Sequence, residues 1–324
     1  MTMSKSLFTL LLISLLLSGC INELIVDRIK IIQSIGLDLE GDTIKGSASY
    51  PDYSKGQEKA PLLLLTSQSQ TIMGIFTSFS NQSEHPAEYG KMRTCVISEL
   101  FAKRGISELA ADVIRDPIKG DNTTITITKD KARKILAETL KLSPFYLSEL
   151  IEQNIENGNT PLNNIHTFMY QYYGEGQDVY LPVVSRSDEG KLFIDGVGVF
   201  KADKLKLLLS NKQGLLLKLL RDDIKSGSSE FTTDQNDKIF LKISHGKRKI
   251  TIENDEKVTV TLKLAVILTD YPENINLTDK KEVIKLTKQI ENKFDSEIKK
   301  ILEYLQANET DPIGIGDRYQ SKAG

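Results

Sequence analysis

An uncharged apolar run close to the N-terminus, with a cysteine just after it, constrains this chain more than any other feature. Leu7–Leu17 contains no charged residue, and Lys5 is the single basic residue before it. A run of this length is too short to cross a bilayer but suits the apolar core of a signal peptide. The folded part of the chain is therefore expected to begin only after this run.

The four residues Leu17–Cys20 resemble a bacterial lipobox, in which small residues precede a cysteine that receives diacylglycerol. We therefore predict that residues 1–19 are removed as a lipoprotein signal peptide and that lipid is attached to Cys20. Lipid chains hold a protein to a membrane, at about 0.8 kcal/mol per buried methylene. The alternative is an ordinary secretory signal peptide that happens to end at a cysteine.

The composition of the remaining chain indicates soluble, folded domains. Charged residues make up 27% of the sequence, both signs occur along its length, and the formal net charge is -2. Proteins that bind nucleic acid usually have a clearly basic surface, so this balance argues against a nucleic-acid partner. After Cys20 no apolar stretch has the length of a membrane helix, and the chain is long enough for about two domains.

The chain has two cysteines, and lipid attachment to Cys20 would leave Cys95 without a disulfide partner. Stability is therefore expected to come from packed cores and not from disulfides. Cys95 lies in Thr94–Ile97, which has the character of a buried strand. We interpret it as a core residue and not as a nucleophile, because no histidine stands in a recognisable triad context.

The order of predicted elements favours a mixed α/β fold of several domains, with β-sheets flanked by α-helices. Thr123–Thr128, for example, alternates threonine with isoleucine as a strand does, while 98–112 has helical spacing with a break at Gly105. We predict an N-terminal α/β region at 20–175, which ends in a helical connector, and a C-terminal α/β region at 176–324.

In the C-terminal region the predicted elements are strands at 179–184, 191–200, 240–244, 249–253 and 257–270, and helices at 215–220 and 279–305. Polar turns are predicted at 245–247 and 253–256. Asp279 and Glu282 have the spacing of a capping box at the start of the last helix. An apolar stripe at spacings of three and four continues along that helix.

The sequence contains no persuasive catalytic, cofactor-binding or metal site, and none is predicted. Its three histidines are far apart and lack metal-ligand spacing. The Gly-x-Gly pairs at 196–198 and 314–316 are interpreted as turns. The basic cluster Lys247–Lys249, predicted at a hairpin turn, has two interpretations: a contact with anionic lipid headgroups, or simple exposure to solvent.

With these segments in place, the chain resembles the Ger(x)C family, the lipoprotein C subunit of bacterial spore germinant receptors. The residues that carry the resemblance, besides the lipobox, are Ile35–Asp38, Ile97–Gly105 with Glu99 and Ala102, Arg115–Pro117, Asp195–Phe200 and Asp311–Gly316. Each short motif is weak by itself, but their order behind a lipobox is specific.

The resemblance implies a non-enzymatic, lipid-anchored subunit that is needed for nutrient-triggered germination and lies on the outer face of the inner spore membrane. It implies two partners, the A and B membrane subunits of the receptor, and it transfers one functional residue, Cys20. Members of the family usually continue past the Asp311–Gly316 motif with a tryptophan-containing stretch and further strands. Since this chain stops at Gly324 and has no tryptophan, we expect either a truncated C-terminal region or an element supplied by a partner.

Two other classes of protein compete with this interpretation. A solute-binding lipoprotein of an uptake system would need a ligand cleft between two lobes. A lipid-anchored cell-wall hydrolase would need a catalytic cluster, which the sequence does not reveal. The identity of any small ligand is not encoded in a recognisable motif.

Overall fold

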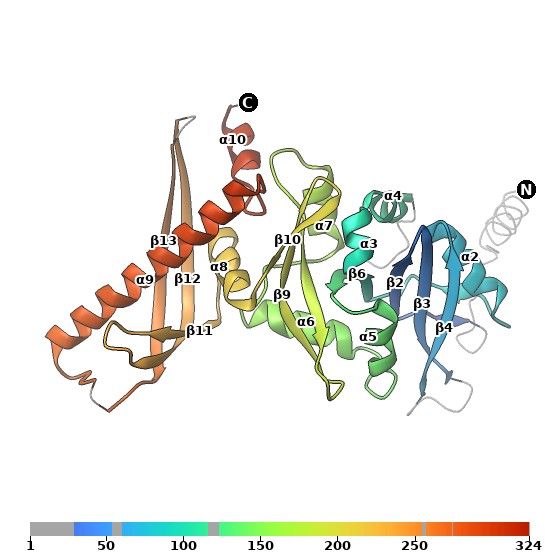
Figure 1. Ribbon diagram of the computed structural model, residues 1–324, viewed down its shortest axis with the longest axis horizontal. Coiled ribbons are helices and arrows are strands. Elements are labelled where there is room, and N and C mark those ends of the chain that lie inside the picture. Colours follow the sequence, from blue (N-terminus) through green and yellow to red (C-terminus); the bar gives the residue numbers. More distant parts are fainter. Residues whose placement is uncertain (1–28, 54–59, 116–122, 255–256, 274, 324) are drawn as a thin grey trace, which may run out of the picture.

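The computed structural model describes residues 29–53, 60–115, 123–254, 257–273 and 275–323. Its largest feature is a mixed sheet of eight strands, with helices on both faces (Figure 1). In spatial order the strands are β10 (Lys204–Leu209), β9 (Leu192–Lys201), β8 (Tyr180–Arg186), β7 (Thr124–Thr128), β6 (Thr94–Ser98), β2 (Ser34–Glu40), β3 (Thr43–Pro51) and β4 (Leu62–Ser69).

The four central strands β8, β7, β6 and β2 run parallel, whereas antiparallel strands extend the sheet at both edges. One register pair, Ile127 with Val183, joins β7 to β8. Beside it the Thr126 hydroxyl donates a hydrogen bond to the Pro182 carbonyl at 2.8 Å. The sheet therefore contains strands from both sides of residue 175, and the division into regions 20–175 and 176–324 stays a prediction.

One face of the sheet is covered by α2 (Ile72–Asn81), α3 (Glu99–Arg104), α4 (Ser107–Arg115) and α7 (Ile165–Tyr173). The opposite face carries α5 (Ala132–Thr139) and α6 (Tyr146–Glu156). Strand β6 shows why both faces need a cover. Its residues Cys95 and Ile97 point into the first cluster and Val96 into the second, and all three are at most 3% exposed.

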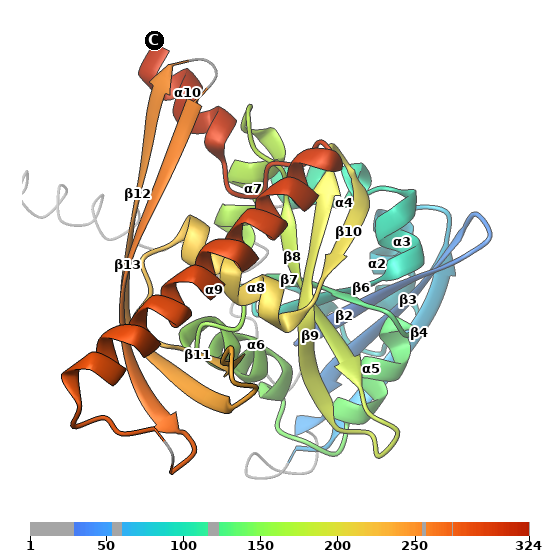
Figure 2. The ribbon, with the colours of Figure 1, turned by 60° about the vertical axis from the view of Figure 1, so that its left-hand side comes forward.

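A second, three-stranded sheet follows in the order β11 (Gly227–Thr232), β12 (Lys238–Asn254) and β13 (Lys257–Asp270). Helix α8 (Asn211–Arg221) lies between the two sheets, and α9 (Lys280–Ala307) crosses the face of the smaller one (Figure 2). The leucines of α8 pack with Val197 and Val199 of β9 and with Leu241 of β12 in one hydrophobic cluster. A short parallel pair, β1 (Lys30–Ile31) with β5 (Ala87–Glu88), and the last helix α10 (Ile315–Ala323) complete the fold.

This architecture confirms the predicted mixed α/β class and most of the predicted elements. The break at Gly105 separates α3 from α4, and its φ of 138° lies in a region that glycine adopts most readily. The predicted capping box of α9 is only half correct. The Asp279 side chain accepts from the Lys281 N–H at 2.8 Å, but Glu282 accepts from the Asn276 N–H instead of the Asp279 N–H.

Two predicted turns are wrong, because their glycines lie inside strands. Residues 245–247 are part of β12, where Gly246 exchanges backbone hydrogen bonds of 2.9 and 3.0 Å with Ile224. A Cβ at Gly246 would lie 2.9 Å from the Leu264 side chain. Glycine therefore leaves room for this side chain to pack against the strand, and it does not form a turn. Gly196 and Gly198 lie within β9, and a Cβ at Gly196 would lie 1.9 Å from the Leu209 carbonyl oxygen.

The close approach at Gly196 gives a stability prediction. Gly196→Ala should lower the free energy of unfolding by about 3 kcal/mol or more, because its φ of 119° is unfavourable for alanine and the new Cβ meets the Leu209 carbonyl. Gly41→Ala is the matched control, since Gly41 has a φ of 60° but no atom within 4 Å of an added Cβ. Denaturant unfolding of both variants measures the difference, and equal losses would contradict the packing explanation.

Candidate functional site

The predicted lipid site, Cys20, lies outside the described residues and stays a prediction. Over the described part of the chain, no helix has both the length and the apolar character needed to cross a membrane.

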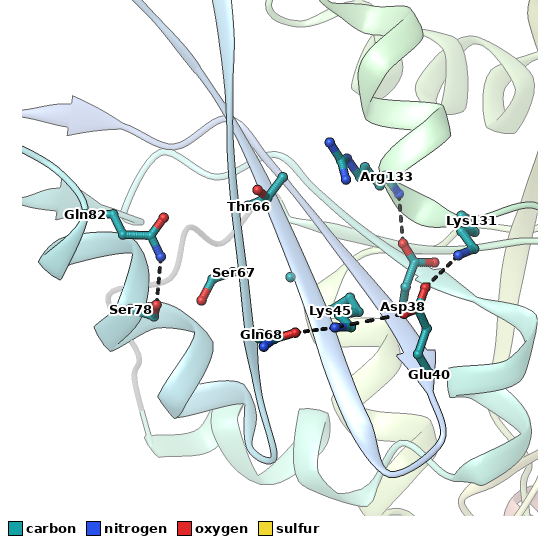
Figure 3. A pocket seen from close by; sticks show the side chains of 11 residues that line it. Asp38, Glu40, Lys45, Thr66, Ser67, Gln68, Ser78, Gln82, Lys131 and Arg133 are labelled. Atoms are coloured by element: carbon teal, nitrogen blue, oxygen red, sulfur yellow. Dashed lines mark hydrogen bonds and ion pairs between the residues drawn. The ribbon is translucent and has the colours of Figure 1, made fainter.

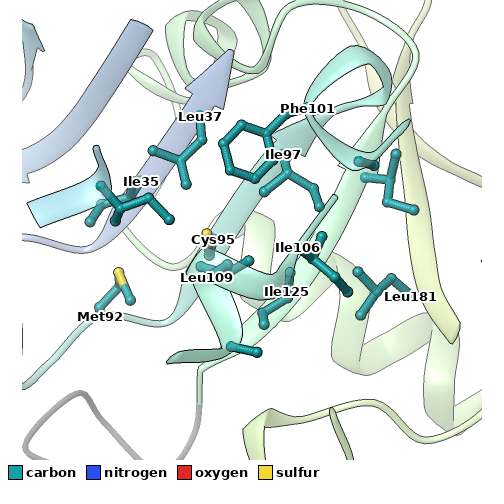
Figure 4. Close-up of a cluster of buried hydrophobic side chains, with 14 of the residues drawn as sticks. Ile35, Leu37, Met92, Cys95, Ile97, Phe101, Ile106, Leu109, Ile125 and Leu181 are labelled. Atoms are coloured by element: carbon teal, nitrogen blue, oxygen red, sulfur yellow. The ribbon is translucent and has the colours of Figure 1, made fainter. Parts of the chain in front are cut away.

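Cys95 is a core residue, as the sequence indicated. It is 3% exposed and lies in the cluster that contains Ile35, Ile97 and Ile125 (Figure 4). Apolar surroundings favour the neutral thiol over the thiolate that a nucleophile needs. Its contribution is therefore packing.

The histidines are not assembled into a site. His85 is half-buried, His166 and His245 are exposed, and the three belong to different parts of the fold. Across the described ranges, no group of His, Cys, Asp and Glu side chains is arranged to hold a metal ion.

A polar cleft of about 530 Å³ is formed by β2, β3, β4, α2 and the start of α5 (Figure 3). The charged groups that line it are Asp38, Glu40, Lys45, Lys131 and Arg133. No sequence motif signals this cleft, because its residues come from five elements that meet only in the fold.

Asp38 lies at the inner end of this polar cleft and caps α5. Its two carboxylate oxygens accept the backbone N–H groups of Ala132 at 2.7 Å and Arg133 at 3.1 Å. These are among the N–H groups that a helix start leaves without partners. Burial raises the pKa of Asp38, and the hydrogen bonds from Arg133 and Ala132 partly oppose this effect.

The other charges of the cleft are mostly paired with one another. Lys131 Nζ lies 2.6 Å from Glu40 Oε1, and this contact lowers the pKa of Glu40. Lys45 donates to Gln68 across the β3–β4 pair. Arg133 has no ion-pair partner among the described residues, and its side chain extends away from Asp38 toward Thr66 in Figure 3. The cleft can thus hydrogen-bond a polar or anionic group, but among its described lining residues no hydroxyl group is paired with a base.

The contact with the start of α5 explains the residue types at Gly36 and Asp38 in the Ile35–Asp38 motif. A Cβ at Gly36 would lie 3.1 Å from the Ala132 Cβ and 2.5 Å from Ser47 Oγ, so glycine lets the helix start lie directly on the strand. Together, Gly36 and Asp38 fix the place of α5 on the sheet.

In the Asp311–Gly316 motif, as at Asp38, an aspartate side chain accepts backbone N–H groups. Asp311 accepts the N–H groups of Gly314 and Gly316, each at 2.8 Å, and its own N–H donates to Asp178 at 2.7 Å. A Cβ at Gly316 would lie 2.8 Å from the carbonyl oxygen of Gly176. Burial raises the pKa of Asp311, against the hydrogen bonds that it accepts. The motif therefore ties the segment before α10 to the start of the β8 region.

The remaining motifs are likewise structural where they are described. Asp195 binds Lys129 Nζ at 2.7 Å and the Ser185 hydroxyl at 3.0 Å. Residues 116 and 117 of the Arg115–Pro117 motif lie outside the described residues.

The basic cluster Lys247–Lys249 does not form a turn. Lys247 and Lys249 are exposed on one face of β12, whereas Arg248 points to the other face and is partly buried. Lys263 of β13 stands directly opposite Lys247. Like charges at paired positions repel each other, so this face favours an anionic neighbour such as a lipid headgroup. The contact with lipid remains a hypothesis.

Comparison with known proteins covers almost the whole chain. Residues 22–186 match the family described as spore germination protein N-terminal domain, and residues 195–324 match the family described as spore germination B3/GerAC-like, C-terminal. The chain is 27% identical over 314 residues to the spore germination protein GerQC of Bacillus cereus, covering 94% of this chain and 87% of the relative. It is 22% identical over 331 residues to the putative spore germination protein YfkR of Bacillus subtilis (strain 168), covering 95% and 85%. No solved structure matches.

The raised pKa of Asp38 predicts a pH-dependent stability. The folded state holds the Asp38 proton more tightly than the unfolded state, so this contribution is present below the ordinary aspartate pKa and falls as pH rises through the raised value. The stability of wild type relative to Asp38→Asn should therefore fall as the pH rises from the ordinary aspartate pKa through the raised value, by at most about 1.4 kcal/mol per pH unit.

Denaturant unfolding at a series of pH values measures this difference. Asp42→Asn, which removes an exposed carboxylate from the β2–β3 turn, is the matched control. A wild-type advantage over Asp38→Asn that grows with pH would contradict the predicted sign.

Proposed function

The chain belongs to the GerAC-like spore germination family, whose two domains match residues 22–186 and 195–324, and from this membership we propose that it is a subunit of a germinant receptor. In this proposal it is the lipid-anchored C subunit, needed for nutrient-triggered germination, and it assembles with the A and B membrane subunits. The observation that carries the proposal is the family match along both halves of the chain.

Attachment through Cys20 is the second part of the proposal. It rests on the apolar run Leu7–Leu17 and the small residues before Cys20. The family is one of spore germination, and an anchor on Cys20 would place the folded regions on the outer face of the inner spore membrane. The lysine face of β12 and β13 has a charge that suits an anionic lipid surface.

We further propose that the subunit works through protein contacts and not through catalysis. The charged motif residues Asp38, Asp195 and Asp311 support this, because each is engaged in a cap or an ion pair that holds the fold together. A carboxylate committed to backbone N–H groups is poorly placed to act as a general base.

A solute-binding lipoprotein is the competing function. Such a protein needs a ligand cleft between two lobes, but the polar cleft at Asp38 and Arg133 lies at one end of a single sheet. The family match supports the receptor subunit over this alternative.

Lipid attachment is tested by replacing each of the two cysteines with alanine in a separate variant. Cys20→Ala should abolish incorporation of labelled palmitate and move the protein from the membrane fraction to the soluble fraction, because the lipid is the proposed anchor. Cys95→Ala is the matched control and should keep both label and membrane attachment, since this thiol is buried in the core. Retention of the Cys20→Ala variant in membranes without a partner would contradict the anchor.

Assembly is tested by affinity purification of the tagged chain from detergent-solubilised spores. A polytopic membrane protein should co-purify in a stable ratio, and deletion of the gene should slow or abolish germination with at least one nutrient. Absence of such a partner, combined with thermal stabilisation of the isolated chain by an amino acid, nucleoside or sugar, would contradict the proposal and favour the solute-binding alternative.

A further inference from the structure

The outer edge of β13 borders an apolar groove that the described chain leaves uncovered. The groove has a volume of about 540 Å³ and lies between β13 and α9. Every second residue of β13 from Val260 to Leu268 points into it, and α9 closes its other side with Val283, Ile290 and Ile298. We call this feature the edge groove.

Two properties of the edge groove distinguish it from ordinary surface. Strand β13 is the last strand of its sheet and pairs with β12 alone among the described strands, so half of its backbone N–H and C=O groups face away from the sheet. Apolar side chains beside this edge are also accessible: Val266 is 36% exposed, Leu277 39% and Val283 37%. Long, apolar, unpaired edges are templates for another strand.

The charged groups of the edge groove are acidic. Glu291 and Asp295 lie one turn apart on α9, with Thr287 one turn before them, and none of the described lysines, arginines or histidines lines the groove. Like charges at this spacing repel each other by about 0.2–0.5 kcal/mol. Glu291 has an exposed partner, Lys288 at 3.6 Å, whereas Asp295 has no ion pair within the described ranges.

From this combination we propose that the edge groove binds an extended segment of a partner protein, which pairs with β13 as an additional strand. The segment has apolar residues at alternate positions, which face α9, and a lysine or arginine that reaches Glu291 and Asp295. Backbone hydrogen bonds to β13 provide affinity, while the apolar groove and the two carboxylates provide specificity. The proposal goes beyond the role in germination and does not depend on it.

A second copy of the chain fits this edge less well. If β13 of another copy paired with its apolar residues toward α9, its Lys257 and Lys263 would point to the opposite face. It would then bring no cation to Glu291 and Asp295. This charge mismatch argues against a second copy, and the proposal names a segment of a different polypeptide as the occupant.

The test uses the full chain in detergent and a synthetic peptide of about nine residues, roughly the length of a strand. The peptide alternates valine with threonine and has lysine in place of its central valine. A tryptophan at its end reports binding by fluorescence, because the chain has no tryptophan. Two control peptides carry glutamate at the centre, or proline in place of two threonines, which removes backbone donors.

We expect saturable binding of the lysine peptide, and weak binding of both controls. Val266→Lys, which places a charge in the groove, should weaken binding at least about tenfold. The matched variant Ile267→Lys, at the neighbouring residue that faces away from α9, should leave affinity within about twofold. Amide hydrogen exchange in Lys257–Asp270 should slow when the lysine peptide binds.

A charge reversal makes the test independent of damage to the sheet. Asp295 is exposed on α9, so Asp295→Lys should keep the fold, weaken the lysine peptide and strengthen the glutamate peptide. Failure of the lysine peptide to bind, equal binding of the proline control, or no preference reversal with Asp295→Lys would overturn the proposal. Dimerisation of the chain that Val266→Lys abolishes would also overturn it, in favour of a second copy.

Discussion

The burial of α8 on nearly all its sides is the constraint on which the arrangement of the two sheets depends. Residues 214–220 of this helix are all buried, because β9 and β10 contact one side and β12, β13 and α9 contact the other. A helix that is apolar all round is stable only when fully enclosed. Separating the sheets would therefore expose several leucines, each worth about 1.5–3 kcal/mol.

Lys218 is a charged residue in the buried part of α8, and its side chain bonds to the segment around the end of α6. Its ammonium group donates to the carbonyl oxygens of Ile155 and Thr160, the latter at 3.1 Å. Burial lowers the pKa of Lys218, and an ammonium without these acceptors would be costly in this place. The connector between α6 and α7 is thus held by the same helix that joins the sheets.

Most elements could be predicted from local sequence, whereas their assembly could not. The alternation in Thr123–Thr128 and the apolar stripe of α9 are local patterns, and both predictions are confirmed. Gly196 and Gly246 led to wrong turn predictions, because glycine in a strand interior and glycine in a turn are indistinguishable without the neighbour that approaches them. Asp38 is separated by about a hundred residues from the helix that it caps, so no local signal marks that role. The role of Asp311 has a local signal in the sequence. Its side chain accepts from the backbone of Gly314 and Gly316, which follow three and five residues later, and aspartate is common at such turns.

The burial of Cys95 determines what thiol reagents would detect on the mature protein. The sequence has two cysteines; if Cys20 carries lipid, the remaining thiol is 3% exposed and shielded from reagents in solution. If a cysteine replaced an exposed residue, such as Tyr304 on α9, its thiol would react with such reagents while Cys95 stayed shielded. Crosslinkers or spin labels could be placed there one position at a time, and the faces that approach membrane proteins could be mapped without first removing native cysteines.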